Sequence, residues 1–580
     1  MSSNPPPDAP SVETNDVVIL GAGIAGSVLA AVLARGGANV LMIDAGTHPR
    51  FAVGESTIPY TSIMARLMAE RYDVPELKAL GTFESVQSKI GPTSGIKRNF
   101  GFLYHRRGEH QNTAEYNENV TPKIANTDSH LFRQDVDAWL VTVAVKYGAR
   151  IRQQVRVTDV DFDDYGATVT GANGETWRTR YVVDASGFRS PLAQKFGLRE
   201  EPSRLRHHSR SMFTHMVGVT PYDDLVPRKA HGNYRRWHQG TLHHVFEGGW
   251  LWVIPFNNHP MATNPLVSVG LTVDPRVHPD PGCGPEEEFR RFVADFPSIA
   301  GQFTNARPVR EWVSTGRLQY SSRQTIGDRW CLMSHAAGFI DPLFSRGLSN
   351  TFDVINALAW RLLDALRDDD FSVERFALVE KLEQGLLDFN DDLVANSFTA
   401  FSDYDLWNAW FRLWSMHQRL AIFVIGRAYG KYRLAGDVSA LDDLERLGVQ
   451  AAMPDHPPTQ ELYARASQEI RAVAAGTTRP ADAAARIMAL LDDADFLPRA
   501  MGLHDPHHRT IHASGPTVAR VLRWSRRSPS SEVADLFYDG ITQVIRLRLA
   551  RGEFAFGAEL KHAVAGLPVL GRPFRADTGW

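Results

Sequence analysis

Asp16-Val-Val-Ile-Leu-Gly-Ala-Gly-Ile-Ala-Gly26 contains a short apolar run that is followed at once by the spacing G-x-G-x-x-G. An Ala-, Leu- and Val-rich segment then continues to about Arg35, and a second apolar run, Asn39–Ile43, ends at Asp44. A strand, a glycine-rich turn, a helix and a second strand in this order are typical of a βαβ unit. The N-terminal region is therefore predicted to be a Rossmann-type nucleotide-binding domain.

Each glycine of the turn has a physical purpose in such a domain. Gly21 allows the tight turn, Gly23 lets the backbone approach a pyrophosphate, and Gly26 lets helix and strand pack closely. The pyrophosphate would lie on the N–H groups at the start of the helix, beside Ala25, where the helix dipole favours an anion. Asp44 is placed to accept hydrogen bonds from ribose hydroxyls.

Features further along the chain favour FAD over NAD as the nucleotide. Glu55 follows a strand–turn segment, Arg133 opens a later helix within reach of the pyrophosphate, and Asp328 lies on a strand far along the chain. A chain that returns to its nucleotide so late has the layout of FAD monooxygenase-type proteins. The further predicted cofactor contacts are Arg50, Ser56 and Gly338.

The composition excludes several other classes of protein. The chain has 580 residues, of which 43% are hydrophobic and 22% are charged, and its formal net charge is −3. These values are ordinary for a globular protein, and the length predicts two or three structural regions. Because no basic run is long enough for a nucleic-acid surface, we expect no nucleic-acid partner.

The cysteines and the N-terminal residues indicate a cytoplasmic protein. Cys283 and Cys331 are too few for a disulfide framework, which suits a reducing compartment. A signal peptide begins with a positively charged segment, but residues 1–16 contain no Lys or Arg. Glycines interrupt the apolar run 17–33, so we expect no membrane span. No His/Cys cluster has the spacing of a metal site, and we expect no metal.

The distribution of apolar residues predicts an α/β fold with an inserted sheet. Residues 1–14 are predicted to form a disordered tail, and residues 15–205 and 310–360 the FAD-binding domain. Alternating strands predict a separate antiparallel sheet on the substrate side over 206–309. Residues 361–580 are predicted to be a helical C-terminal region.

Four segments of the chain resemble the flavin-dependent halogenases. Gly54–Pro59 is similar to their G-E-[SA]-x-x-P segment, Trp250–Pro255 matches W-x-W-x-I-P, and Phe339–Gly347 matches F-x-x-P-x-x-S-x-G. Gly95–Lys97 resembles the segment that bears their catalytic lysine. The four segments occur in the expected order, and the resemblance, which covers about residues 16–420, is strongest to members that halogenate phenols.

The resemblance implies an activity and its partners. Reduced FAD, O₂ and chloride or bromide would produce hypohalous acid inside the protein, and this oxidant would halogenate a phenolic small molecule, either free or tethered to a carrier protein. The sequence shows no second dinucleotide fingerprint, so FADH2 is expected from a separate flavin reductase. The resemblance also suggests a role in secondary metabolism, such as antibiotic biosynthesis, and allows a homodimer.

The resemblance implies that Lys97 is the catalytic residue. Its ammonium would hydrogen-bond hypohalous acid, or its free amine would be halogenated to a haloamine. Lysine suits either role because burial lowers its pKa, whereas arginine stays cationic. The alternatives are an ordinary exposed lysine at position 97 and a catalytic role for Lys89.

Two further assignments have structural alternatives. Trp250 and Trp252 alternate along a strand and so face the same side, where with Pro255 they would separate substrate from flavin or simply pack in the core. Ser345, Gly347 and Leu348 precede or begin a helix. They would bind the halide through backbone N–H groups, or form a plain helix start capped by Ser345.

The remaining polar candidates are less specific. Asp403 or Asp405 is a candidate base for the phenol, and Asp274 either contacts the flavin or is a solvated turn acid. Three histidines are expected to be structural: His215, His243 and His244. The alternative functions are an aromatic hydroxylase of the same fold, which the tryptophan barrier argues against, and a flavin-binding protein that has lost the activity, which the presence of Lys97 and Trp250 argues against.

Overall fold

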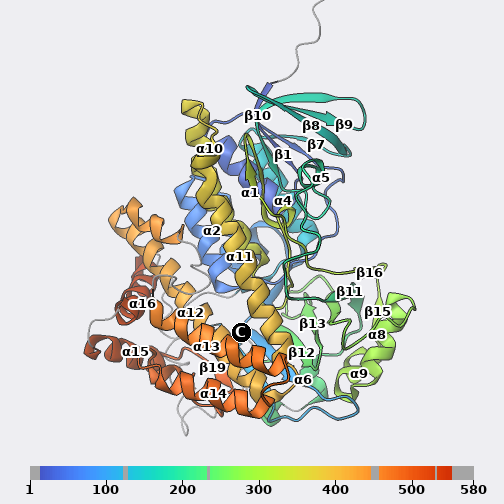
Figure 1. Ribbon diagram of the computed structural model, residues 1–580, viewed down its shortest axis with the longest axis vertical. Helices are drawn as coiled ribbons and strands as arrows, with labels where there is room; N and C mark the ends of the chain where they lie inside the picture. The colour runs from blue at the N-terminus through green and yellow to red at the C-terminus, as the bar shows by residue number, and fades with distance from the viewer. Residues whose placement is uncertain are drawn as a thin grey trace, which may run out of the picture.

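The computed structural model describes residues 14–121, 128–226, 228–231, 235–445, 456–528 and 532–550 (Figure 1). The predicted disordered tail therefore lies outside the described residues, apart from Thr14.

The first sheet is the predicted nucleotide-binding sheet. Its strand order is β17-β18-β10-β1-β2-β7, with β9 paired to β10 and β8 to β9. Five strands are parallel: β1 (Thr14–Leu20), β2 (Val40–Ile43), β7 (Arg150–Arg152), β10 (Thr176–Asp184) and β18 (Trp330–Leu332). Three are antiparallel to their neighbours: β8 (Val157–Asp163), β9 (Gly166–Gly171) and β17 (Ile326–Gly327).

Both faces of this sheet are covered, which explains the continuous apolar run of β1. Val17 and Ile19 pack into one hydrophobic core, and Val18 and Leu20 pack into another on the opposite face. A parallel strand buried on both faces needs apolar residues at every position. Helices α1 (Ile24–Arg35), α4 (Arg133–Lys146) and α10 (Gly347–Asp368) lie together on the first of these faces.

The second sheet is larger than the sequence predicted. Its order is β15-β11-β14-β13-β12-β4-β5-β19, with β16 also paired to β11, so it extends well outside residues 206–309. Most pairs are antiparallel, but β12 with β4 and β19 with β5 are parallel. Its strands are β4 (Asn99–Tyr104), β5 (Tyr116–Val120), β11 (Arg210–Val217), β12 (Thr241–Phe246), β13 (Gly249–Pro255), β14 (Val267–Val273), β15 (Arg307–Pro308), β16 (Val313–Ser314) and β19 (Thr510–Ile511).

The reason for the difference is the burial of β4. All six of its residues are buried, so the strand needs neighbours on both edges and cover on both faces, and pairing with β12 and β5 supplies the neighbours. One of these partners, β12, lies far from β4 in the sequence, and a local sequence pattern does not reveal such a pairing.

The C-terminal part is helical, as predicted, over its described residues. Its α-helices are α11 (Val373–Ala400), α12 (Tyr404–Ala435), α13 (Pro457–Ala474), α14 (Pro480–Asp493), α15 (Gly515–Arg527) and α16 (Glu532–Ala550). Helix α12 packs against α14, α16 and the N-terminal helix α2 (Pro59–Arg71) (Figure 1). The short strand β19 joins this region to the second sheet, and residues 551–580 lie outside the described residues. None of the helices in the described ranges is both long and apolar enough to span a bilayer.

Candidate functional site

A cavity of about 1750 Å³ lies at the carboxyl ends of the parallel strands of the first sheet. It is larger than the ~300–1,000 Å³ of ordinary small-molecule pockets. In sheets of this kind, ligands bind at this edge. Most of the predicted cofactor residues line the cavity: Gly21, Gly23, Ala25, Asp44, Arg50, Glu55, Ser56, Arg133 and Gly338.

The glycine turn fits a dinucleotide. Gly21 has φ +99°, and a Cβ there would lie 2.7 Å from the carbonyl oxygen of Ala185. Gly26 lies behind the cavity wall, where a Cβ would be 2.0 Å from the carbonyl oxygen of Gly21. Gly23 faces the cavity, and its Cβ position has no atom within 4 Å. Open space therefore lies in front of the N-terminus of α1, where a pyrophosphate would bind.

Asp44 is fully engaged by hydrogen bonds. Its carboxylate accepts from Ala22 N (2.7 Å) and Gly46 N (2.8 Å), and from Arg50 Nη1 (2.9 Å) and Nη2 (2.8 Å). A carboxylate offers about four acceptor positions. A ribose hydroxyl that bonds Asp44 would therefore replace one of the bonds to Arg50, whose side chain is 38% exposed.

Arg133 and Glu55 are held in place by neighbours. Arg133 pairs with Asp137 through Nε (2.7 Å) and Nη2 (2.9 Å), and its Nη1 donates to Gly54 O (3.2 Å). Glu55 Oε1 lies 2.7 Å from His215 Nε2, and both side chains are buried. His215 therefore has the structural partner expected of it.

The structure does not bring Asp328 to this cavity. Asp328 is exposed in the turn before β18, which runs parallel to β10, so it lies at the amino end of the sheet. The cavity is at the opposite edge, where Ser334 and His335 follow β18 and line the wall. Enclosure by protein lowers the pKa of His335 to about 4. We expect His335 to contact the cofactor in place of Asp328.

Lys97 is buried directly behind the cavity wall. It ends the short strand β3 (Gly95–Lys97), which pairs with β6 (Asp128–His130), and is 1% exposed. Its Nζ donates to Ser56 Oγ (2.7 Å) and Thr57 O (2.7 Å), and it lies 4.0 Å from the centre of the Phe100 ring. Ser56 lines the cavity and so connects Lys97 to it.

The surroundings of Lys97 make its ammonium easier to deprotonate than that of an exposed lysine. Burial lowers the pKa of Lys97 to about 7, and the nearby carboxylate of Asp128 opposes this shift. Burial also raises the pKa of Asp128 to about 6, against the effects of Lys97 and a hydrogen bond from Ser62. The amine and the ammonium of Lys97 are therefore both accessible near neutral pH.

The two predicted tryptophans stand side by side on the cavity wall. Trp250 and Trp252 both line it, and their ring centroids are 5.4 Å apart. Trp252 pairs in register with Gly270, where a Cβ would lie 2.1 Å from the indole, so glycine makes room for the ring. Pro255 is not part of the lining, and its carbonyl oxygen instead lies 2.9 Å from His130 Nδ1.

The loop with Ser345, Gly347 and Leu348 also lines the cavity. Ser345 has φ +53°, an uncommon backbone conformation for a residue other than glycine, and Gly347 begins the 22-residue helix α10. The first N–H groups of a helix have no partner within the helix. The loop therefore presents free donors next to the open space.

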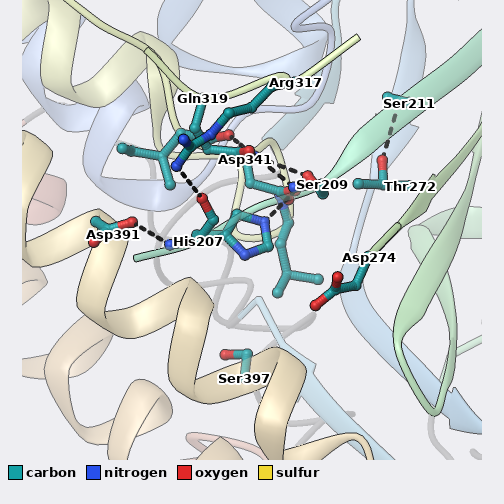
Figure 2. A network of polar contacts seen from close by, with 12 residues as sticks. His207, Ser209, Ser211, Thr272, Asp274, Arg317, Gln319, Asp341, Asp391 and Ser397 are labelled. Atoms are coloured by element: carbon teal, nitrogen blue, oxygen red, sulfur yellow. Dashed lines mark hydrogen bonds and ion pairs between the residues drawn. The ribbon is translucent and has the colours of Figure 1, made fainter. Parts of the chain in front are cut away.

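A buried polar network holds the other end of this loop (Figure 2). Asp341 accepts from Leu343 N (2.9 Å) through Oδ1, and its Oδ2 lies 3.3 Å from His207 Nε2 and 3.4 Å from Ser209 Oγ. Gln319 Nε2 donates both to Ser209 Oγ (2.7 Å) and to the carbonyl oxygen of Ile340 (2.9 Å). These polar contacts were not predicted from the sequence.

The remaining candidates lie outside the cavity lining. Lys89 is exposed at the end of α3 (Phe83–Lys89), and Asp403 caps α12 by accepting from the N–H groups of residues 405 and 406. Asp405 is exposed, so neither acid is placed to act as a base in this cavity. Asp274 is paired with Arg276 and stands apart from the polar network (Figure 2).

Two of the buried histidines differ in their surroundings. His244 Nδ1 lies 2.8 Å from His105 Nε2, and its Nε2 lies 2.6 Å from Gln302 Oε1. The residue is not part of the cavity lining, as expected of a structural histidine. His243 lines the cavity between Phe100 and Phe102, whose ring centroids lie 4.5 and 4.4 Å away. Thr241, which also lines the cavity, and His130, whose Nε2 lies 3.0 Å from Thr241 Oγ1, were not among the predicted site residues.

The chain matches known proteins over most of its length. Residues 14–370 match the model of the FAD binding domain family. The chain is 49% identical to tetracycline 7-halogenase of Kitasatospora aureofaciens, over 90% of this chain and 94% of that protein. It is 48% identical to the monodechloroaminopyrrolnitrin halogenase PrnC of Pseudomonas fluorescens, over 90% and 93%.

A solved structure has the same fold. The crystal structure of the halogenase PltM in complex with phloroglucinol and FAD matches with a TM-score of 0.82 and 35% identity, over 86% of this chain and 99% of that chain. The expected likeness to a halogenase of phenols is thus confirmed. The two sequence relatives have higher identity than PltM.

Proposed function

This chain belongs to the family of flavin-dependent halogenases, and we propose that it halogenates an electron-rich phenolic small molecule with hypohalous acid made inside the protein. The observation that carries the proposal is the position of Lys97. A buried amine with a lowered pKa lies one hydrogen bond behind a large cavity, whose wall also contains Trp250 and Trp252.

The residues around the cavity fit FAD. The N-terminus of α1 would hold the pyrophosphate, with Gly23 in front of it, and Asp44 would hold the ribose. Bound as FADH2, the cofactor would supply the electrons with which O₂ and a chloride or bromide ion become hypohalous acid and water. We propose that FADH2 comes from a separate flavin reductase.

The loop at the start of α10 would bind the halide. The N–H groups of Gly347 and Leu348 are unpaired within the helix, and the helix dipole favours an anion there. Asp341, held by Ser209 and His207, keeps the preceding turn in place through its bond to Leu343 N. In this arrangement the halide would lie on the cavity side of the Trp250–Trp252 wall.

Lys97 would then carry the halogen to the substrate. The neutral amine attacks the halogen of hypohalous acid, an N–X bond forms, the O–X bond breaks, and the oxygen leaves as water with the proton lost from nitrogen. The haloamine next transfers its halogen to the ring carbon, the ring loses a proton, and the amine is restored. An electron-rich ring such as a phenolate is the best acceptor in such a transfer.

Trp250 and Trp252 would keep the aromatic substrate off the cofactor. Their indoles stand on the cavity wall, and Trp252 is fixed by a hydrogen bond from its Nε1 to Ser268 Oγ (3.2 Å). An aromatic ring that does not reach the flavin is not hydroxylated there. This supports halogenation rather than hydroxylation.

A product assay tests the proposed function. We expect purified protein to convert members of a panel of free phenols to products carrying chlorine or bromine, read by mass spectrometry. Conversion should require FAD, a flavin reductase with NADH, and halide together. An oxygenated product formed with NADPH, without reductase or halide, would mean a hydroxylase, and halogenation of pyrroles but of no phenol would overturn the substrate class.

The pH dependence of halogenation tests the form of Lys97. Because the attacking species is the amine, kcat should rise with pH through about 7, the pKa of Lys97. The charge of Asp128 raises the pKa of Lys97, so Asp128→Asn should lower it and move the half-maximum of kcat to lower pH. If ionisation of the phenol set the profile instead, the half-maximum of kcat would not move in Asp128→Asn.

A second carboxylate serves as the control for this profile. Glu288, on α8 (Pro285–Ala294), is buried and paired with Arg210 of β11, so Glu288→Gln should leave the half-maximum unchanged. A rate that decreases between pH 6 and 8 would show that the ammonium is the active form. A half-maximum that moves to higher pH in Asp128→Asn would show that the profile does not report the ionisation of Lys97.

A further inference from the structure

A continuous chain of buried hydrogen bonds runs from Lys97 to the last residue of β13. Lys97 Nζ is 2.7 Å from Ser56 Oγ, which is 2.8 Å from Thr241 Oγ1. Thr241 Oγ1 is 3.0 Å from His130 Nε2, and His130 Nδ1 is 2.9 Å from the carbonyl oxygen of Pro255. The four side chains that form these links are at most 7% exposed.

The chemistry of the groups fixes the direction of every bond in this chain. The carbonyl oxygen of Pro255 can only accept, so Nδ1 of His130 carries the proton. Burial, together with the nearby charge of Lys97, lowers the pKa of His130 to about 3, so the ring is neutral and Nε2 can only accept. Thr241 therefore donates its single proton to His130.

The same reasoning continues to Lys97. Because the hydroxyl proton of Thr241 is used, its oxygen accepts the proton of Ser56. Ser56 has no second proton, so its oxygen accepts from Lys97 Nζ. The second acceptor of Lys97 is the carbonyl oxygen of Thr57 (2.7 Å). Two N–H groups of Lys97 are thus committed, and the neutral amine keeps its lone pair free in one remaining direction.

We propose that His130 is a positioning residue for Lys97 that acts through Thr241 and Ser56. The inference rests on the proposed function, in which the lone pair of Lys97 attacks hypohalous acid. Nε2 of His130 accepts the proton of Thr241, so Thr241 must accept the proton of Ser56. The hydroxyl of Ser56 therefore cannot rotate to donate to Lys97. Without that acceptor, Ser56 can donate its proton to the amine and cover the lone pair that must react.

Loss of this acceptor should waste oxidant rather than stop its formation. His130→Phe keeps an aromatic ring but has no acceptor, and Thr241→Val removes the hydroxyl in the middle of the chain at nearly constant volume. We expect kcat for halogenation to fall by about tenfold or more in each variant. The KM for the phenol should be unchanged, and more halogen should appear in a soluble trap for hypohalous acid.

Two further variants separate positioning from folding. His130→Gln retains an amide oxygen that accepts from Thr241 and should restore most of the rate. The double variant His130→Phe/Thr241→Val should be no slower than the slower single variant, because both interrupt one chain. A matched control is His244→Phe, which removes a buried histidine of β12 that lies outside this chain and should leave the trapped fraction unchanged.

The outcomes distinguish this inference from the proposed function. If His130→Phe and Thr241→Val halogenate at the wild-type rate with no extra trapped halogen, while Lys97→Met is inactive, the positioning role is wrong and the role of Lys97 stands. Multiplied effects in the double variant would also overturn it, since the residues would then act independently. If Lys97→Met itself stays active, the part that fails is the role of Lys97 in the proposed function.

Discussion

Replacement of Lys97 by methionine should abolish halogenation while FAD binding and hypohalous acid formation continue. Lys97 is 1% exposed, and methionine is an unbranched side chain that suits the space that a buried lysine leaves. The variant keeps the glycine turn, Asp44 and the halide loop, none of which Lys97 contacts. We expect kcat for halogenation to decrease by ~10³-fold or more, as for loss of a group that acts directly on the reacting atoms.

The measurement should follow the oxidant as well as the product. Mass spectrometry would report the halogenated phenol, and a soluble trap would report the hypohalous acid that Lys97→Met no longer uses. Flavin fluorescence during titration should show unchanged FAD affinity. Lys97→Arg should be as inactive as Lys97→Met, because a guanidinium stays cationic and has no lone pair to offer.

Lys89 provides the matched control. It is the alternative catalytic lysine that the sequence suggests, and it lies exposed at the end of α3. Lys89→Met should therefore halogenate at the wild-type rate. Product formation by Lys97→Met, or its loss in Lys89→Met, would contradict the assignment, and an active Lys97→Arg would point to hydrogen bonding by a cation instead of a haloamine.

Features that depend on neighbouring residues could be predicted from the sequence. The βαβ unit was readable because Gly21, Gly23 and Gly26 act on one turn and lie within six positions. The pairing of Trp250 and Trp252 on one face followed from the two-residue period of a strand. In each case the cause of the structure lies within a few residues of its effect.

Features that depend on distant segments could not be predicted in this way. The second sheet takes β4 and β19 from far outside residues 206–309, because buried strand edges need partners that the local pattern does not name. Asp328 has a plausible local motif, yet the direction of β18 places it at the wrong edge of the sheet. His130, Thr241 and Ser56 come from three separate segments, and only the fold brings them to Lys97.

A single methyl group at Gly26 should remove flavin binding by disrupting the turn itself. A Cβ at this position would lie 2.0 Å from the carbonyl oxygen of Gly21 and 3.2 Å from Ile19 Cγ2. The carbonyl oxygen and carbonyl carbon of Gly21 are backbone atoms that cannot rotate away, so β1 and α1 must separate. We expect Gly26→Ala to lower the free energy of unfolding by about 3 kcal/mol or more, and to bind no FAD.

Gly23 should respond in the opposite way, and the contrast tests the role of the turn. Its φ of −72° suits any residue and its Cβ position is open, so Gly23→Ala should fold with an unchanged Tm when no flavin is present. The added methyl group, however, points into the space kept for the pyrophosphate, so FAD affinity should fall by about tenfold or more, or ~1.4 kcal/mol. Gly284→Ala, at an open site that begins α8, is the control and should change neither property. Tm and flavin titration measure both effects, and a Gly23→Ala variant that binds FAD as tightly as wild type would show that the pyrophosphate does not lie at the start of α1.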